Sequence, residues 1–396
     1  MKADAPVAVA HAPLPERADY VVIGGGIMGL AVAYELARRG AERIVVVDRT
    51  YLCGGASGRN GGGVRAQWSS ATNIDLMRRS LALCADFATR MRVNVWFRRG
   101  GYLFLARTDA RAAQLAASCE LQNAHGLRTR IVDGAEAKGI VPGLDPRGIV
   151  CASWNPDDAV VFPWPFVWGY ARVAVKHGVS IHTHTLVTDL RTEGRRVTGV
   201  VTSRGTIATS RVLLCAGAWS PEIARMVGVE LPSRPHRHEI CSTEPLKPFL
   251  RPLVGDLEDG LYFSQSARGE IVGGIGNEDV PPGLDQGSSM KFLGLYARAL
   301  SRAMPRLGAV KILRQWAGCY DLTPDGNPLC GAIDEVSGLY LMSGFMGHGF
   351  MMAPIMGELF ARHLLSDGEE EKALFERWAL RRYREGRLLS ESMILG

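Results

Sequence analysis

Apolar and polar positions in the first fifty residues predict a strand, a helix and a second strand in close succession. Residues 19–23 and 43–47 are short apolar runs typical of buried strands, and residues 30–39 predict a helix that ends at Gly40. A glycine-rich turn over residues 24–29 joins the first strand to the helix. The order of these elements within roughly thirty residues is typical of a dinucleotide-binding unit.

The pattern farther along the chain predicts helices and strands that interleave. Helices are expected over 72–92, 109–125, 166–177, 291–304 and 353–365, and another helix is expected to start within 132–138. Strands are expected over 101–106, 180–185, 187–190, 197–202, 206–209, 211–215 and 338–343, and residues 232–276 alternate in a β-rich manner. We therefore predict an α/β fold, a Rossmann-type domain with an inserted β-sheet-rich domain of α+β character.

The spacing of the first glycines explains how this unit would hold a dinucleotide. Gly24 permits the tight turn, Gly26 lets the backbone approach a pyrophosphate, and Gly29 lets helix and strand pack closely. Asp48 ends the second strand, where an acid accepts hydrogen bonds from ribose hydroxyls and disfavours the 2′-phosphate of NADP. NAD and FAD both remain, and the alternative is a tight turn that binds no nucleotide.

Two more glycine-rich segments favour a flavin dinucleotide. Residues 54–63 follow the second strand, and there Ser57 and backbone N–H groups are expected to hold phosphate oxygens while Arg59 adds positive charge. Residues 344–350 lie at a strand-to-helix junction near the C-terminus. A long, extended cofactor needs several close backbone approaches from distant segments, which a nicotinamide dehydrogenase rarely supplies.

Composition and charge narrow the class further. The 396 residues are 47% hydrophobic with a net charge of +6, which fits a globular protein and offers no aromatic-basic patch for nucleic acid. The eight cysteines show no C-x-x-C or zinc spacing, so we predict reduced thiols in a cytoplasmic protein and no metal site. No apolar window is long enough for a transmembrane segment. Residues 1–17 predict a flexible leader, and the basic stretch 377–387 an exposed C-terminal helix, with an acidic partner as the alternative.

Five motifs in order resemble the D-amino-acid-oxidase-like FAD-dependent oxidoreductase family. They cover residues 24–29, 56–62 (Ala-Ser-Gly-Arg-Asn-Gly-Gly), 215–220 (Cys-Ala-Gly-Ala-Trp-Ser), 316–328 (from Trp-Ala-Gly to Thr-Pro-Asp-Gly-Asn-Pro) and 344–350. The resemblance is strongest to the β subunits of heteromeric sarcosine oxidases and of proline and opine dehydrogenases, and weaker to glycine oxidase. It implies a discontinuous FAD-binding domain over 18–98, 155–226 and 315–370 and a substrate domain over 99–154 and 227–314. The basic residues beyond this range are expected to form a C-terminal helix over 371–396.

The resemblance also implies which residues meet the cofactor. Asp48 and Arg49 would face the adenosine, and Val187 would hold the adenine through its backbone. The residues expected to bind FAD are Gly24, Gly26, Ile27, Met28, Gly29, Asp48, Arg49, Ala56, Ser57, Arg59, Asn60, Gly62, Gly63, Val187, Gly217, Trp219, Gly344, Gly347, His348, Gly349 and Phe350.

Oxidation of an amino acid by FAD passes a hydride from the carbon next to nitrogen to flavin N5, so the protein must bind a neutral amine and neutralise the carboxylate. Arg65 is the first candidate for the carboxylate ligand, with an ordinary structural salt bridge as the alternative. His348 is expected near the flavin, where it stabilises reduced flavin or positions substrate, unless it is a histidine with purely structural partners.

Four other side chains are weaker candidates for the substrate cavity. Tyr262 and Tyr320 are expected to line it. His236 and His238 alternate on a predicted strand, so both face the same side, either into the cavity or, as we favour, onto the surface.

Departures from the family pattern bear on cofactor attachment and substrate. Gly318 stands where monomeric sarcosine oxidases carry a flavin-linking cysteine, with Cys319 one residue later, so FAD is expected to be non-covalent. Met351 replaces a lysine that would bind carboxylate. No lysine lies near Val272, where related oxidases carry one that helps them use oxygen, which favours a dehydrogenase or an oxidase that reacts with oxygen at a second flavin. Tyr320 replaces the carboxylate-binding arginine of glycine oxidase, so the substrate need not be a simple small α-amino acid.

A second flavin is the remaining cofactor option. The β subunits of sarcosine oxidases carry FMN on the histidine of a His-Asp-Ala-Val-like stretch, whereas residues 157–160 here read Asp-Asp-Ala-Val. Covalent FMN is therefore disfavoured, and a non-covalent FMN at a subunit interface remains an option.

Three hypotheses for function follow. The first is a catalytic FAD subunit that oxidises an N-alkyl, proline-like or opine amino acid within a hetero-oligomer. The second is a stand-alone enzyme like glycine oxidase or a D-amino-acid dehydrogenase, and the third is a non-catalytic flavin-binding electron-transfer subunit. A pyridine-nucleotide disulfide reductase is excluded, because the chain lacks a redox cysteine pair and a second dinucleotide motif.

Overall fold

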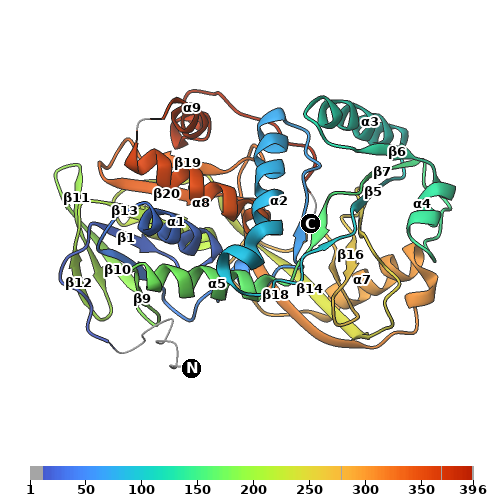
Figure 1. Cartoon of the computed structure of the whole chain (residues 1–396), viewed down its shortest axis with the longest axis horizontal. Coiled ribbons are helices and arrows are strands. Elements are labelled where there is room, and N and C mark those ends of the chain that lie inside the picture. The colour runs from blue at the N-terminus through green and yellow to red at the C-terminus, as the bar shows by residue number, and fades with distance from the viewer. Residues whose placement is uncertain (1–11, 278, 367, 395–396) are drawn as a thin grey trace.

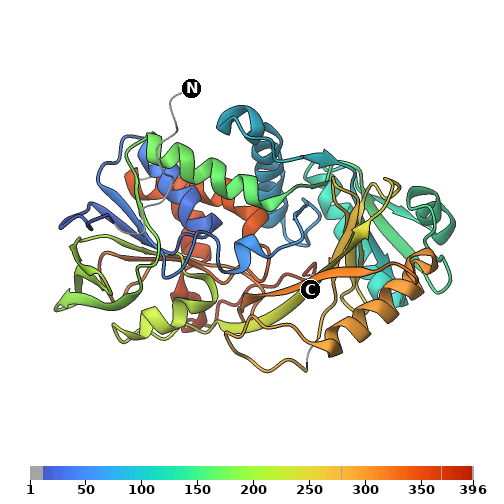
Figure 2. The same cartoon turned by 90° about the horizontal axis from the view of Figure 1, so that it is seen from below.

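The computed structural model describes residues 12–277, 279–366 and 368–394 and shows two halves side by side (Figures 1 and 2). The first half is built on a six-stranded sheet in the order β19-β20-β13-β1-β2-β9. Its strands are β1 (Tyr20–Ile23), β2 (Ile44–Val47), β9 (Ser180–His182), β13 (Val212–Leu214), β19 (Leu329–Ala332) and β20 (Leu339–Ser343). All neighbours are parallel except β19 and β20. The predicted strand-helix-strand unit at the N-terminus is thus present.

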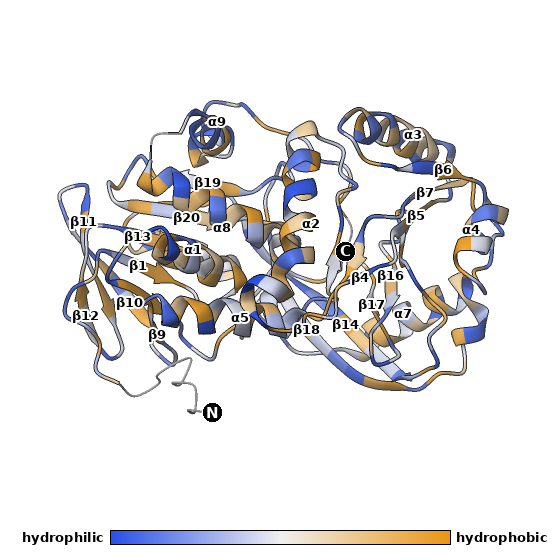
Figure 3. Ribbon diagram, in the orientation of Figure 1, coloured by the Kyte–Doolittle hydropathy of each residue, from blue (hydrophilic) through white to orange (hydrophobic). Residues whose placement is uncertain are grey.

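Alternating side chains of these strands pack on opposite faces of the sheet, as the period of two requires. Val22 and Val46 face the helices, whereas Val21 and Val45 face a small antiparallel sheet. The helices are α1 (Ile27–Arg38), α2 (Ala71–Met91), α5 (Pro163–Lys176) and α8 (Gly349–Leu365), and the small sheet is β10 (Val187–Glu193), β11 (Arg196–Thr202) and β12 (Gly205–Ala208). Figure 3 shows the central strands in hydrophobic colours, because both faces of this sheet are covered.

The second half is an eight-stranded sheet in the order β18-β14-β17-β16-β15-β5-β7-β6. Its strands are β5 (Tyr102–Ala106), β6 (Arg130–Val132), β7 (Cys151–Asn155), β14 (Arg234–Pro245), β15 (Leu253–Asp256), β16 (Tyr262–Gln265), β17 (Glu270–Gly274) and β18 (Ile312–Leu322). Helices α4 (Gly134–Ile140) and α7 (Met290–Ala303) share an apolar cluster with one face, and α3 (Asp109–Ala124) contributes to a cluster on the other (Figure 2). The fold is α/β with a β-rich second half, as predicted.

Short elements complete the structure. They are β3 (Gly63–Val64), β4 (Arg98–Arg99) and β8 (Ala159–Val160), which form a sheet, then α6 (Ser220–Arg225), α9 (Glu369–Arg377) and 3-10 turns at Ala56–Gly58, Gly217–Trp219, Pro305–Leu307 and Leu380–Tyr383. None of the helices in the described part of the chain combines the length and the apolar character that a membrane crossing requires.

Three expectations about segments need correction. No strand is predicted at 312–322, yet β18 pairs with β14 along most of its length, so the boundary expected at residue 315 falls inside a strand of the large sheet. The C-terminal basic helix over 371–396 is wrong, because helix α9 stops at Arg377 and Arg382 is fully buried. Residues 12–17 of the expected leader are held on the small sheet, where the N–H of Ala208 donates to the carbonyl of Glu16 at 2.8 Å; residues 1–11 lie outside the described residues.

Candidate active site

A cavity of about 610 Å³ runs between the two halves, within the range of cofactor pockets. At one end its lining includes Asp48, at the carboxyl end of β2, and Val187, in the small sheet. At the other end it includes Tyr102 and Tyr262 of the second half. Ligands of open α/β sheets bind at the carboxyl ends of the strands. The cavity therefore joins a nucleotide-type site to a chamber in the β-rich half.

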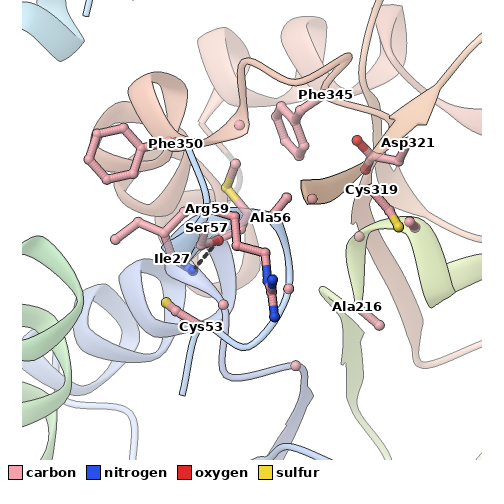
Figure 4. Close-up of a pocket in the computed structure, with 18 of the residues that line it drawn as sticks. Ile27, Cys53, Ala56, Ser57, Arg59, Ala216, Cys319, Asp321, Phe345 and Phe350 are labelled. Atoms are coloured by element: carbon pink, nitrogen blue, oxygen red, sulfur yellow. Dashed lines mark hydrogen bonds between the residues drawn. The ribbon is translucent and has the colours of Figure 1, made fainter. Parts of the chain in front are cut away.

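The N-terminus of α1 forms one wall of this cavity. Ser57 Oγ accepts from the N–H of Ile27 at 3.0 Å and so holds the second glycine loop against the helix (Figure 4). The N-cap residue Gly26 provides no side-chain cap, so the helix dipole and its remaining N–H groups suit an anion. Gly29 lies outside the lining, and a Cβ there would collide with the carbonyl of Gly24. The site thus fits phosphate oxygens at the place the sequence predicts.

Asp48 fixes the turn around this anion site. Its carboxylate accepts from the N–H of Gly25 at 2.8 Å and from the N–H of Thr50 at 2.8 Å. Nearby, the guanidinium of Arg49 lies 4.1 Å from the ring centre of Trp219, and both residues line the cavity. A cation stacked on an aromatic ring makes a flat, charged wall that suits an adenosine.

Replacing Asp48 with asparagine tests this arrangement. Both carboxylate oxygens accept from backbone N–H groups, and an amide nitrogen cannot accept, so one hydrogen bond is lost. We expect the Kd for FAD to rise about tenfold, since a hydrogen bond to a charged group contributes about 1.5–3 kcal/mol. The Kd is measured by ultrafiltration, which separates free from bound flavin, and the control is Asp86→Asn at an exposed position of α2. Equal Kd values for FAD in the two variants would contradict the role of Asp48 in the cofactor site.

Arg59 plays a different part from the one expected of a free phosphate ligand. Its guanidinium donates to the carbonyls of Gly54 and Ala317, each at 3.1 Å, and so ties the second glycine loop to β18. The side chain still lines the cavity (Figure 4). Asn60 braces the same loop, with its amide donating to the carbonyl of Ser57 at 2.7 Å and its oxygen accepting from the N–H of Gly62 at 2.8 Å.

The third glycine segment closes the cavity from the α8 side. Gly347 has a φ of +82°, and a Cβ there would meet the ring of Tyr320 at 2.5 Å, so only glycine fits. Gly344 is not part of the lining; its N–H donates to Asp321 Oδ2 at 2.6 Å and thereby fixes the turn. Asp321 itself lines the cavity (Figure 4), and burial raises its pKa. The sequence did not single out Asp321, since it lies on the unpredicted strand β18.

The other predicted residues all line this cavity. They are Gly24, Ile27, Met28, Ala56, Gly62, Gly63, Val187, Gly217, Gly349 and Phe350 on the nucleotide side, and Arg65, Tyr262, Tyr320 and His348 among the candidate substrate contacts. Sequence reasoning missed Tyr102, Leu253 and Gln286, which also line it. Tyr102 and Leu253 belong to apolar strands and gave no polar signal that could have marked them.

Arg65 lies in the cavity wall with only 1% of its surface exposed. Its guanidinium donates to the carbonyls of Gln67 and Met393, approaches His348 Nε2 at 3.1 Å and lies 4.2 Å from the ring centre of Trp68. No carboxylate in the described residues forms a salt bridge with it, so the structural salt bridge that the sequence left open is absent there. Burial lowers the pKa of Arg65, while the charges of Tyr102, Glu391 and Asp158 act in the opposite direction without a contact. A buried guanidinium with neutral partners is a strong site for a carboxylate.

Two histidines beside the cavity are neutral. Burial lowers the pKa of His348 well below its ordinary value, and the charge of Arg65 lowers it further. Burial likewise lowers the pKa of His238 to about 3. His238 stacks on Tyr320 with ring centres 4.7 Å apart and its Nε2 lies 3.0 Å from the hydroxyl of Tyr262. The surface placement we favoured is therefore wrong for His238; His236 is half-buried and is not part of the lining.

These features fit FAD and define a dinucleotide-dependent oxidoreductase. The elongated cavity, the uncapped helix N-terminus and the tight glycine turns, where a Cβ at Gly24 or Gly347 would collide with neighbouring atoms, are what a long cofactor with a pyrophosphate requires. A neutral chamber with one buried cation adjoins them.

Comparison with known proteins gives the family. The model of the FAD dependent oxidoreductase family matches residues 19–363, and the chain belongs to this family. It is 31% identical over 386 residues to the sarcosine oxidase subunit beta of Rhizobium meliloti, covering 94% of this chain and 90% of that one. The corresponding subunit of Rhodobacter capsulatus is 30% identical, with 96% and 92% covered. The crystal structure of L-proline dehydrogenase from P. horikoshii superposes with a TM-score of 0.89 at 34% identity, covering 95% of this chain and 100% of that one.

Proposed function

We propose that this protein oxidises an amino acid whose nitrogen is secondary or N-alkylated, such as a sarcosine-like, proline-like or opine substrate. The observation that supports this most is Arg65, a buried cation in the cavity wall with neutral partners among the described residues. Arg65 would hold the substrate carboxylate. The relatives named sarcosine oxidase subunit beta and L-proline dehydrogenase support an N-substituted amine.

The residues around the chamber would act by binding and orientation. FAD, when bound, supplies a hydride acceptor for the carbon next to nitrogen. Arg65 fixes one end of the substrate, and the rings of Tyr262, Tyr320 and His238 enclose the rest. Because His238 and His348 are neutral and weakly basic, neither would donate a proton to the amine or take one from it.

We also propose that FAD is bound without a covalent link. Gly318 carries no nucleophile, and the Cys319 thiol contacts the carbonyls of Gly283 and Asp285 at 3.8 and 3.6 Å. Burial raises the pKa of Cys319 to about 11, which keeps it a thiol at neutral pH.

The proposal extends to assembly and location. The named relatives are β subunits, which supports membership in a hetero-oligomer. Asp157 pairs with Arg128 at 2.5 Å, so an FMN near residues 157–160 would be non-covalent. All eight cysteines are free, which supports a reducing compartment such as the cytoplasm.

An anaerobic titration of the FAD-loaded protein tests the proposal. The panel holds sarcosine, L- and D-proline, glycine, D-alanine and an opine, and the visible flavin band is followed. Bleaching by an N-substituted amino acid supports the proposal, whereas bleaching by glycine or D-alanine alone favours a stand-alone enzyme like glycine oxidase. A fully loaded flavin that no amine reduces would favour a non-catalytic electron-transfer subunit.

The pH dependence of kcat/KM should follow the substrate rather than the protein. The pKa of His238 is lowered to about 3 and that of His348 is lowered well below its ordinary value, so both imidazoles are neutral at neutral pH. We expect kcat/KM to rise with pH until the amine of the substrate is deprotonated, and the inflection to move with the pKa of each amine. Stopped-flow reduction with two amines of different pKa measures this, and a common inflection between pH 6 and 7 would show a titrating protein group instead.

A further inference from the structure

Residues 388–394 cross from the first half of the molecule to the centre between the halves (Figure 1). Burial alternates along them: Glu391 and Met393 are buried, whereas Ser390 and Ser392 are exposed. Met393 is fully buried and packs in an apolar cluster with Tyr102 and other residues of the second half. An extended segment that is so regularly buried is part of the fold rather than a loose end.

The carboxylate of Glu391 anchors this segment at the start of α2. It accepts from the N–H of Ser69 at 2.9 Å and from the amide of Asn73 at 2.9 Å, and also from the Ser69 hydroxyl. The N–H of Ser392 donates back to Ser69 Oγ at 2.8 Å. Two chain segments are thus locked together four residues after Arg65.

The same segment contacts Arg65 directly. Arg65 Nη2 donates to the carbonyl of Met393 and lies 3.1 Å from His348 Nε2, and Nη1 donates to the carbonyl of Gln67. A carbonyl directs the guanidinium without cancelling its charge, in contrast to a carboxylate in contact. Glu391 acts on Arg65 through its charge, but no hydrogen bond or salt bridge joins the two in the described residues. The direction of Arg65 therefore depends on where residue 393 is held.

We propose that residues 388–394 form a strap that orients Arg65 towards the substrate carboxylate, with Glu391 as its positioning residue. This inference rests on the proposed function, because the strap acts on Arg65, the group that would bind the substrate carboxylate. Binding of the carboxylate, rather than loading of FAD, is the step that it governs.

Glu391→Ala tests the strap in the FAD-loaded full chain. The probe is butyrate, a monocarboxylate without an amine, and its Kd is read from the change in the visible flavin spectrum. We expect the Kd for butyrate and the KM for the amine substrate to rise about tenfold, while the rate of flavin reduction at saturating substrate changes less than about threefold. FAD content should match the wild type. The matched control is Glu385→Ala, an exposed glutamate paired with Arg387. An unchanged Kd for butyrate in Glu391→Ala would overturn the strap.

A double-variant comparison separates positioning from general loosening. In an Arg65→Met background, Glu391→Ala should have no further effect on butyrate affinity, because the strap acts through Arg65; an equal effect in both backgrounds overturns the proposal. If Glu391→Ala loses FAD, the same butyrate titration is made with Ser69→Ala, which removes only the hydroxyl that donates to Glu391, and the same rise in Kd is expected. A wild-type protein that binds butyrate but is reduced by no amine would contradict the proposed function, while the strap would still be judged on butyrate.

Discussion

Replacing Arg65 with methionine is expected to lower kcat/KM for a carboxylate-bearing amine by about a thousandfold, or ~4 kcal/mol of transition-state stabilisation. The guanidinium lies in the cavity wall and has no carboxylate in direct contact in the described part of the chain, although Glu391 and Asp158 act on it through their charges, so it can still pair with a substrate. Removal of that charge would leave the substrate carboxylate buried and unpaired. Steady-state kinetics with the best amine of the panel measures the loss.

The stability of Arg65→Met should change much less than its activity. Arg65 is buried among the rings of Trp68 and Phe104 and has lost its hydration. Methionine loses the hydrogen bonds to the carbonyls of Gln67 and Met393, which costs stability, but it also removes a buried charge, which offsets that cost. We therefore expect Tm and FAD content of Arg65→Met to stay close to the wild type.

A matched control variant distinguishes the expected loss of kcat/KM in Arg65→Met from a general effect of removing an arginine. Arg98 is half-buried, donates to the carbonyl of Gln265 and lies outside the cavity lining. Arg98→Met should leave kcat/KM within about twofold. Equal losses of activity in the two variants would contradict the assignment of Arg65 to the substrate carboxylate.

The nucleotide side of the site could be predicted closely because its chemistry depends on the backbone. Gly26, Ser57 and Asp48 are required at given spacings by the turn, the helix N-terminus and the strand end. These are local constraints, and the structure brings all three residues to one cavity. Two of the residues expected to bind FAD lie outside the lining: Gly29 lets helix and strand pack closely, and Gly344 fixes a turn.

The substrate side could be predicted only in part, because its residues meet through long-range pairing. His238 and Tyr320 lie on β14 and β18, and their contact depends on the register of two long strands. Strand β18 contains Gly318 and polar residues such as Gln315, and it lacked a clear alternation. The C-terminal segment was mistaken for an exposed basic helix, because charge patterns cannot show that Arg382 finds a buried partner.

The ion pair between Arg382 and Asp325 supports the second large prediction. Both side chains are buried, and Arg382 Nε donates to Asp325 Oδ2 at 2.8 Å. Asp325 also accepts from the Tyr383 hydroxyl and from the N–H of Leu389, where the strap begins. Removal of one partner from a buried pair leaves the other charge unpaired and typically costs about 3–5 kcal/mol.

Arg382→Met should therefore lower Tm by roughly 6–10 °C, whereas Arg381→Met next to it should change Tm by less than about 2 °C. Arg381 pairs with Glu376 and Asp334 at the surface, where ion pairs contribute little. Differential scanning fluorimetry at neutral pH compares the two. Similar shifts in both variants would show that the buried pair is no more stabilising than a surface one.

The stabilisation by the Arg382–Asp325 pair should depend on pH, because folding shifts the pKa of Asp325. Burial alone would raise the pKa of Asp325, but the hydrogen bonds from Arg382 and Tyr383 and the charge of Arg382 outweigh it, so the pKa is lowered. A carboxyl whose pKa is lowered by folding adds stability above its unfolded pKa of about 3.9 and loses it as pH falls through the folded value. The Tm difference between wild type and Arg382→Met should thus be full at pH 7 and shrink below about pH 4. The N–H of Leu389, in the strap, donates to the same Asp325 carboxylate. Arg382→Met should therefore also weaken butyrate binding, because a displaced strap would no longer orient Arg65.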